Sequence, residues 1–192
     1  MVAKKKITGI ILAGGKSSRM GSDKGFIKYK DEPFVMHSIK ALRPIVNDIL
    51  IVTNNPSYDV FGLTRIDDII ENAGPLSGVY SGLKSSKTDY NLILSCDIPL
   101  IKTVALEKIT AQIDEKYDII SLKSHGKLMP LIAFYNKRCE TVFLKLLDDG
   151  ERRMSKAFEN CTVKTIELTP EFNSYTTNIN TPSELNEIRN ET

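Results

Sequence analysis

The sequence predicts an α/β fold built on a largely parallel sheet. Short apolar runs alternate along the chain with longer segments in which apolar residues recur every three or four positions, the pattern of βα units. The first run ends at paired glycines and the second at an Asn-Asn-Pro turn, as expected where buried strands lead into loops. No Gly/Ser linker, internal repeat or low-complexity tract divides the 192 residues, so we expect a single domain, 1–192.

The strands and helices of this fold can be assigned by residue range. Five apolar runs, rich in isoleucine, leucine and aromatic residues, are expected as strands: 7–12, 49–52, 92–94, 118–122 and 131–135. Four segments have the spacing of helices that cover a sheet: 34–42, 77–83, 104–113 and 141–147. The longest irregular stretch lies at 169–181 and is either a binding loop or a crossing over the surface.

The composition is typical of a protein with one sizeable core. Hydrophobic residues make up 41% and charged residues 26%, and the net charge of +2 is too small for a general nucleic-acid or membrane surface. The three cysteines lack CxxC pairing, which argues against a disulfide framework or a zinc site. The N-terminal apolar stretch is too short for a membrane helix. We therefore expect a cytoplasmic protein that binds neither nucleic acid nor membrane.

The glycine-rich segment after the first predicted strand carries the clearest chemical signal. Gly14 and Gly15 let the backbone approach a ligand closely, so that N–H groups can point at phosphate oxygens, and Arg19 and Lys24 can neutralise those oxygens. The segment is not a P-loop, because Ile10 stands where the first glycine of that motif belongs. For the paired glycines alone, a surface turn is the alternative.

This segment and four shorter motifs resemble the MobA family of molybdenum cofactor guanylyltransferases. The segment is similar to the family signature LAGGxSxRMGxDK, with matches at Leu12, Ala13, Gly14, Gly15, Ser17, Arg19, Met20, Gly21, Asp23 and Lys24. The shorter motifs are GPLSG, CDIP, GERR and NINTP, beginning at residues 74, 96, 150 and 178. The matches extend over nearly the whole chain. The resemblance implies a Rossmann-like, three-layer α/β/α fold of the nucleotide-diphospho-sugar transferase type.

The resemblance also implies a reaction. Such enzymes transfer GMP from GTP to the terminal phosphate of molybdopterin or Mo-molybdopterin, which forms the molybdopterin guanine dinucleotide cofactor and releases pyrophosphate. The acceptor phosphate attacks the α-phosphorus directly, so neither a covalent intermediate nor a general base is required. Molybdopterin-inserting proteins and molybdoenzymes are the protein partners that the resemblance suggests.

Asp97 is the expected ligand of a magnesium ion. It follows a buried strand at what should be its C-terminal end, where open α/β sheets bind ligands, and Mg²⁺ needs only one or two protein carboxylates. An Asx turn before Pro99 is the structural alternative. We expect Arg19 and Lys24 to bind the phosphates, and we assign these two residues and Asp97 as the catalytic residues. Cys96 is expected to be a small buried neighbour.

The remaining nucleotide contacts are assigned by position in the family pattern. Leu12 and Ala13 are expected to line the nucleotide together with the two glycines that follow them. Asp68 is expected to accept hydrogen bonds from guanine N1–H and the exocyclic amine, which would reject adenine, with its neighbour Asp67 as the alternative. Asn54 is a weaker candidate, because an asparagine is expected there for turn reasons.

The acceptor contacts are inferred from resemblance alone. Four residues lie in family-like elements and offer donors for a phosphate and a heterocycle edge: Asn178, Asn180, Arg152 and Arg153. The two arginines could equally begin a solvated helix.

Two other functions fit parts of the sequence. A related enzyme could use CTP to cytidylate molybdopterin, or could activate a sugar phosphate. A nucleotide-sensing subunit on an inactive transferase fold is the non-enzymatic alternative. Such a subunit would not need Arg19, Lys24 and Asp97 together, so their joint presence favours catalysis.

Overall fold

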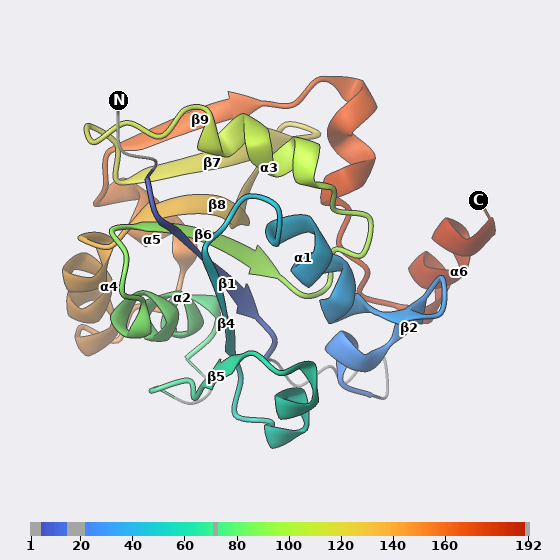
Figure 1. Ribbon diagram of the computed structural model, residues 1–192. Coiled ribbons are helices and arrows are strands. Elements are labelled where there is room, and N and C mark those ends of the chain that lie inside the picture. The colour runs from blue at the N-terminus through green and yellow to red at the C-terminus, as the bar shows by residue number, and fades with distance from the viewer. Residues whose placement is uncertain (1–4, 15–21, 71–72, 191–192) are drawn as a thin grey trace.

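A mixed β-sheet forms the centre of the protein (Figure 1). The computed structural model describes residues 5–14, 22–70 and 73–190. The sheet has the strand order β5-β4-β1-β6-β8-β7-β9, formed by β1 (Ile7–Leu12), β4 (Asp48–Val52), β5 (Thr64–Ile66), β6 (Tyr90–Ser95), β7 (Ile119–Ser124), β8 (Lys127–Asn136) and β9 (Val163–Glu167). Among these described strands, only β8 runs against the rest, because it pairs antiparallel with β6 and β7. The predicted largely parallel sheet is confirmed.

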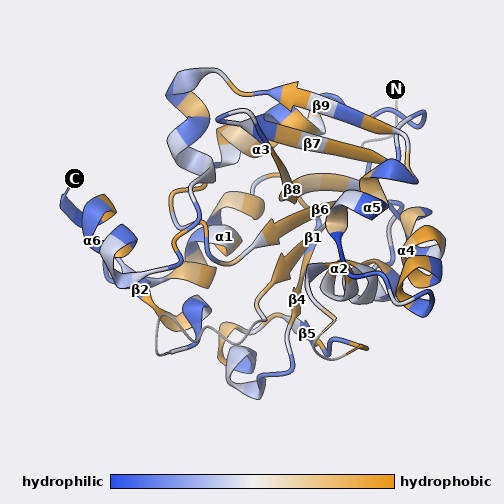
Figure 2. Cartoon of the chain, turned by 180° about the vertical axis from the view of Figure 1, so that it is seen from behind, coloured by the Kyte–Doolittle hydropathy of each residue, from blue (hydrophilic) through white to orange (hydrophobic). Residues whose placement is uncertain are grey.

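Helices cover both faces of the sheet. One apolar core lies under α1 (Phe34–Leu42) and α3 (Thr103–Thr110), and a second lies under α2 (Pro75–Ser85), α4 (Cys139–Asp148) and α5 (Met154–Glu159). Successive side chains of a strand point to opposite faces, so Ile11 belongs to the first core and Ile10 to the second. The central strands are mostly apolar (Figure 2), as is typical of strands buried on both faces. The expected three-layer α/β/α arrangement is confirmed.

The elements that the sequence did not predict are short or lie at the edges of the sheet. They are the hairpin of β2 (Lys28–Tyr29) and β3 (Glu32–Pro33), and the edge strands β5 and β9. An edge strand has one neighbour and partly exposed side chains, so β9 mixes polar and apolar residues and lacks a continuous apolar run. Each of the five predicted strands and four predicted helices is present, with bounds that shift by a few residues.

The predicted irregular stretch is partly ordered. Pro170–Thr176 forms a 3₁₀ helix, η3, and the chain then passes the end of β6 before α6 (Pro182–Asn190) begins at a proline, a residue favoured at the first helical position. A small third core holds α6 against the β2–β3 hairpin; its members are Tyr29, Phe34, Ile179, Leu185 and Ile188. The segment between η3 and α6 is thus anchored beside the sheet. Two further 3₁₀ helices, η1 (Lys24–Phe26) and η2 (Pro56–Phe61), follow the loops after β1 and β4.

No helix in the described ranges is long and apolar enough to cross a lipid bilayer.

Candidate active site

Loops that follow four neighbouring parallel strands meet at one edge of the sheet. The strand register aligns the row Ile66, Val52, Leu12 and Ser95 across β5, β4, β1 and β6. Within two residues of this row come the predicted site residues Asp68, Asn54, Ala13 with Gly14, and Asp97. Since neighbouring strands lie about 4.8 Å apart, three spacings give the row a span of roughly 14 Å. Such a row suits a ligand whose two ends contact different loops.

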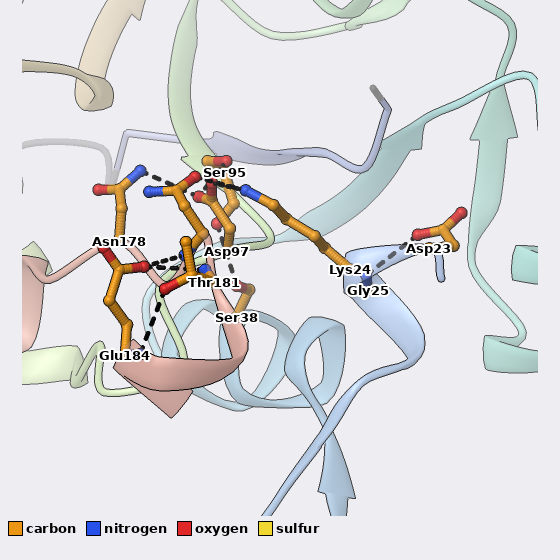
Figure 3. A network of polar contacts seen from close by, with 10 residues as sticks. Asp23, Lys24, Gly25, Ser38, Ser95, Asp97, Asn178, Thr181 and Glu184 are labelled. Atoms are coloured by element: carbon orange, nitrogen blue, oxygen red, sulfur yellow. Dashed lines mark hydrogen bonds and ion pairs between the residues drawn. The ribbon is translucent and has the colours of Figure 1, made fainter. Parts of the chain in front are cut away.

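Asp97 lies at the centre of a polar cluster at the end of β6 (Figure 3). Its Oδ1 accepts hydrogen bonds from the Ser95 hydroxyl at 2.6 Å and from Asn178 Nδ2 at 3.1 Å. Its Oδ2 accepts a hydrogen bond from Lys24 Nζ at 3.1 Å, and the same ammonium donates to Asn180 Oδ1 at 2.6 Å. The fold therefore brings together four of the predicted site residues from three distant parts of the chain.

The cluster is largely withdrawn from solvent. The side chains of Lys24 and Asp97 are only 19% and 13% exposed. Their attraction is therefore less screened than that of a surface pair. They border a cavity of about 110 Å³, which is also lined by Ala13, Gly14, Asp23, Ser95 and Cys96. Burial raises the pKa of the Cys96 thiol, which keeps it protonated, and the expectation of a small buried neighbour is confirmed.

The segment that carries the two asparagines is fixed by its backbone. Ile179 N donates to Asp97 O at 2.8 Å, and Glu184 accepts from the backbone N–H groups of Asn180 at 2.6 Å and Thr181 at 2.9 Å. Glu184 N in turn donates to the Thr181 hydroxyl, so Thr181 and Glu184 form a capping box at the start of α6. These backbone hydrogen bonds lower the pKa of Glu184.

At the other end of the row, the two adjacent acids face different surroundings. Asp68 Oδ1 accepts hydrogen bonds from the hydroxyls of Ser77 and Ser81 on α2, and Asp68 N donates to Asn54 Oδ1 at 2.6 Å. Asp67 instead pairs with Arg65, and its side chain is 73% exposed. The carboxylate of Asp68 therefore has a fixed orientation beside Asn54, whereas that of Asp67 lies on the surface.

The arginines of the GERR motif make local contacts. Arg152 donates to the carbonyl oxygens of Leu147 and Glu151, and Arg153 pairs with Glu151 while remaining 69% exposed. Across the described ranges, no contact joins either arginine to the Asp97 cluster. Arg153 directly precedes α5.

The remaining predicted residues belong to the loop after β1. The side chain of Leu12 is 9% exposed and belongs to the second core, so only its backbone lies at the sheet edge. Ala13 N donates a hydrogen bond to Val52 O at 3.0 Å. Among the residues that the structure describes, no neighbouring atom lies within 4 Å of the position that a Cβ on Gly14 would occupy, so none of them blocks the approach of a ligand to this backbone. Gly15 and Arg19 lie outside the described residues.

Sequence analysis missed a second polar cluster around Asp23. Its Oδ1 accepts hydrogen bonds from Gly25 N at 3.0 Å and the Tyr58 hydroxyl at 2.5 Å, and its Oδ2 accepts from Asn55 Nδ2 at 2.9 Å. The sequence matches Asp23 to the family signature without indicating a role, and it predicts only a turn at Asn55. Nothing local marks Tyr58, because its partner lies 35 positions away.

Comparison with known proteins places the chain in a family. A family model described as "MobA-like NTP transferase domain" matches residues 9–163. The chain belongs to this family. A protein of Flavobacterium johnsoniae named "Probable molybdenum cofactor guanylyltransferase" is 36% identical over 182 residues, which are 95% of this chain and 96% of the relative. A "Molybdenum cofactor guanylyltransferase" of Vibrio campbellii is 32% identical over 179 residues, with 92% and 91% covered.

Solved structures share the fold of this MobA-like domain. The molybdopterin-guanine dinucleotide biosynthesis protein A of Archaeoglobus fulgidus superimposes with a TM-score of 0.78 at 19% identity, and the match covers 96% of this chain and 100% of that chain. A 4-diphosphocytidyl-2C-methyl-D-erythritol synthase of Anaerococcus prevotii gives 0.79 at 12% identity, with 99% and 97% covered. The predicted family and nucleotidyltransferase-type fold are confirmed, and the chain is an enzyme of the nucleotidyltransferase class.

Proposed function

We propose that this enzyme transfers GMP from GTP to the terminal phosphate of molybdopterin or Mo-molybdopterin and releases pyrophosphate. The observation that carries the proposal is the cluster of Lys24, Asp97 and Asn180 at the end of β6, within a MobA-like domain. Relatives that match most of the chain are named molybdenum cofactor guanylyltransferases, which supports guanine as the base and molybdopterin as the acceptor.

The Asp97 cluster has the donor set for a magnesium ion. Mg²⁺ prefers oxygen ligands and commonly takes one or two carboxylates, with water and phosphate oxygens completing its octahedron. The Asp97 carboxylate and the Asn180 amide oxygen already converge on one cation, the ammonium of Lys24. Within the described ranges, no group of three or more His, Cys, Asp or Glu side chains forms an alternative metal site. Bound there, Mg²⁺ would offset negative charge on the phosphates.

The protein residues then act mainly by position and charge. Lys24 would bind a phosphate oxygen, with Arg19 of the same loop as its proposed partner. No described residue crowds Gly14, which supports close approach of a phosphate to the loop after β1. The attacking phosphate monoester is already anionic near pH 7, so the chain need only hold it in line with the α-phosphorus and stabilise the developing charge.

Asp68 is the proposed reader of guanine. The hydroxyls of Ser77 and Ser81 hold its Oδ1, so the carboxylate presents a fixed edge beside Asn54. A carboxylate accepts hydrogen bonds from guanine N1–H and the exocyclic amine, whereas adenine offers an unprotonated N1 there. An adenine base would leave the carboxylate without these donors, which is how a polar site rejects an analogue.

The acceptor would lie on the opposite side of Asp97 from the base. Asn178 and Asn180 are the proposed contacts, because both side chains already reach the Asp97 cluster. The local contacts of Arg152 and Arg153 favour the alternative that they begin α5, so any acceptor role for them requires their side chains to move.

The deciding experiment measures pyrophosphate release with molybdopterin, magnesium and each of GTP, CTP and ATP. We expect turnover with GTP and little with the other two; equal turnover with CTP would overturn the assignment of the base. Asp97→Asn should lower kcat by about 10²-fold or more, as loss of one charge-stabilising group does. Asp48→Asn is the matched control, because Asp48 is exposed at the opposite end of β4. Unchanged kcat in Asp97→Asn would remove Asp97 from the mechanism.

A further inference from the structure

We propose that Asp23 and Tyr58 are positioning residues that set the place of Lys24 in the active site. The inference rests on the proposed function, because it concerns how Lys24 is held for phosphate binding. The Asp23 carboxylate accepts three hydrogen bonds, one from Gly25 in its own loop and two from the loop after β4, and Asp23 directly precedes the residue that reaches Asp97.

The backbone of Lys24 is held by a short turn that Asp23 caps. Lys24 begins the 3₁₀ turn η1, and the carboxylate of Asp23 caps that turn by accepting from Gly25 N. Asp23 O also accepts from Phe26 N at 3.1 Å, and Lys24 O accepts from Ile27 N at 3.1 Å. The backbone from which the Lys24 side chain extends therefore depends on Asp23.

Asp23 is itself held by the loop after β4. The Tyr58 hydroxyl donates to Oδ1 and the Asn55 amide donates to Oδ2, so both oxygens are tied to the loop after β4. Tyr58 is fully buried and its ring packs edge-on against Phe26, with centroids 4.7 Å apart. Burial raises the pKa of Tyr58, so the phenol stays protonated and remains a donor. A rigid part of the fold thus anchors the carboxylate.

Gly25 shows how closely the two loops are packed. A Cβ at this position would lie 2.0 Å from the Tyr58 hydroxyl oxygen, far inside contact distance. The hydroxyl therefore occupies the space that any other side chain would need, and glycine is required by this approach. The turn that carries Lys24 rests directly on Tyr58.

Catalysis depends on the position of the Lys24 ammonium relative to Asp97 and Asn180. Lys24 Nζ reaches Asp97 and Asn180 from a backbone that is fixed on the opposite side of the cavity. Catalytic groups need placement to within about 0.5 Å, and a displacement of about 1 Å can cost 10²-fold in rate. Removing one hydroxyl from Tyr58 frees Asp23 to turn and should displace Lys24 without touching the substrate.

The test compares Tyr58→Phe with Tyr135→Phe. Each removes one hydroxyl from a fully buried tyrosine, but the Tyr135 hydroxyl donates to Pro130 O and not to a residue of the Asp23 or Asp97 cluster. We expect similar falls in Tm, and a fall in kcat/KM for GTP of tenfold or more for Tyr58→Phe alone. Equal kcat/KM in the two variants would overturn the proposal. If the wild-type enzyme releases no pyrophosphate from GTP, the proposed function fails and not this inference. The GTP affinities of the two variants then still test whether Tyr58 positions Lys24.

A double-variant series tests whether Tyr58 acts through Lys24. Once Lys24→Ala is present, adding Tyr58→Phe should lower kcat/KM by less than twofold, whereas adding it to wild type costs tenfold or more. Additive effects in the two backgrounds would contradict the proposal. Asp23→Asn retains an oxygen for Gly25 N–H and the Tyr58 hydroxyl, so it should keep more activity than Asp23→Ala. If Asp23→Asn loses as much as Asp23→Ala, Asp23 contacts the ligands itself and is not a positioning residue.

Discussion

At the scale of single residues, adjacent side chains differ sharply in what they can do. Asp67 and Asp68 are neighbours in sequence, yet one pairs with Arg65 at the surface and the other is held by two serines of α2. The two side chains have different partners because they follow directly on β5, and successive residues of an extended segment point to opposite sides. The sequence alone left the choice between them open.

The same pair of acids supplies a controlled test of base recognition. Asp68→Asn should lower kcat/KM for GTP by roughly 10 to 100-fold, since a hydrogen bond to a charged group contributes about 1.5–3 kcal/mol. It should also reduce the preference for GTP over inosine triphosphate, which lacks the exocyclic amine. Asp67→Asn should change kcat/KM by less than twofold. Steady-state kinetics with both nucleotides checks this, and the reverse ranking would make Asp67 the reader.

At the scale of elements, α2 packs unusually close to the sheet. A Cβ on Gly82 would lie 2.6 Å from Ile10 Cγ2 and 3.2 Å from Val52 Cγ2. Glycine is costly inside a helix, so its presence here reflects this close approach. The approach brings the serines of α2 within reach of Asp68.

Two glycines of α2 predict opposite effects on stability. Gly82→Ala should lower the free energy of unfolding by about 1–3 kcal/mol, because the added methyl overpacks the interface with β1. In Gly78→Ala the added Cβ would lie 3.4 Å from Leu12 Cδ2, which is an ordinary contact distance. This substitution should leave the free energy of unfolding unchanged or raise it by up to about 1 kcal/mol. Urea denaturation of both variants checks the pair. Equal destabilisation would show that α2 is not packed as described.

The start of α6 predicts a dependence on pH. The folded pKa of Glu184 is lowered, so its capping contribution is present above the unfolded pKa of about 4.3 and is lost as pH falls through the folded value. Glu184→Ala should therefore cost about 1 kcal/mol at pH 7 and less below about pH 4. It should also raise KM for molybdopterin, because Asn180 loses its backbone anchor. A constant difference from pH 7 to pH 3 would contradict the capping role.

At the scale of the whole molecule, the site depends on segments that only the complete fold brings together. Four strand ends supply one row of residues, and the segment before α6 returns from the far end of the chain to contact Asp97. The third core holds that segment in place (Figure 1). A ligand that spans the row therefore stabilises the native packing of all these loops.

Binding should accordingly raise thermal stability. At a GTP concentration 100 times the dissociation constant, with magnesium present, the folded state gains about 2.7 kcal/mol, or roughly 5 to 10 °C in Tm. ATP should give a much smaller shift, and EDTA should reduce the shift with GTP. Differential scanning fluorimetry checks the three conditions. Equal shifts with GTP and ATP would show that the fold does not select the base.

The sequence by itself determined the core of the fold and the chemistry of one loop. Strands buried on both faces are mostly apolar, so the central strands are visible as runs; edge strands such as β9 are half exposed and carry no such pattern. Lys24, Asp97, Asn178 and Asn180 were predicted from motifs, and the fold places them in one cluster.

Only the tertiary structure decided which partners those residues have. The links from Lys24 to Asp97 and from Asp23 to Tyr58 join positions 73 and 35 residues apart, and neither residue's local sequence specifies the other. Motifs record which side chains a site needs, because chemistry restricts residue type. Distances, orientations and supporting residues such as Tyr58 depend on how strands and loops pack, which no local pattern encodes.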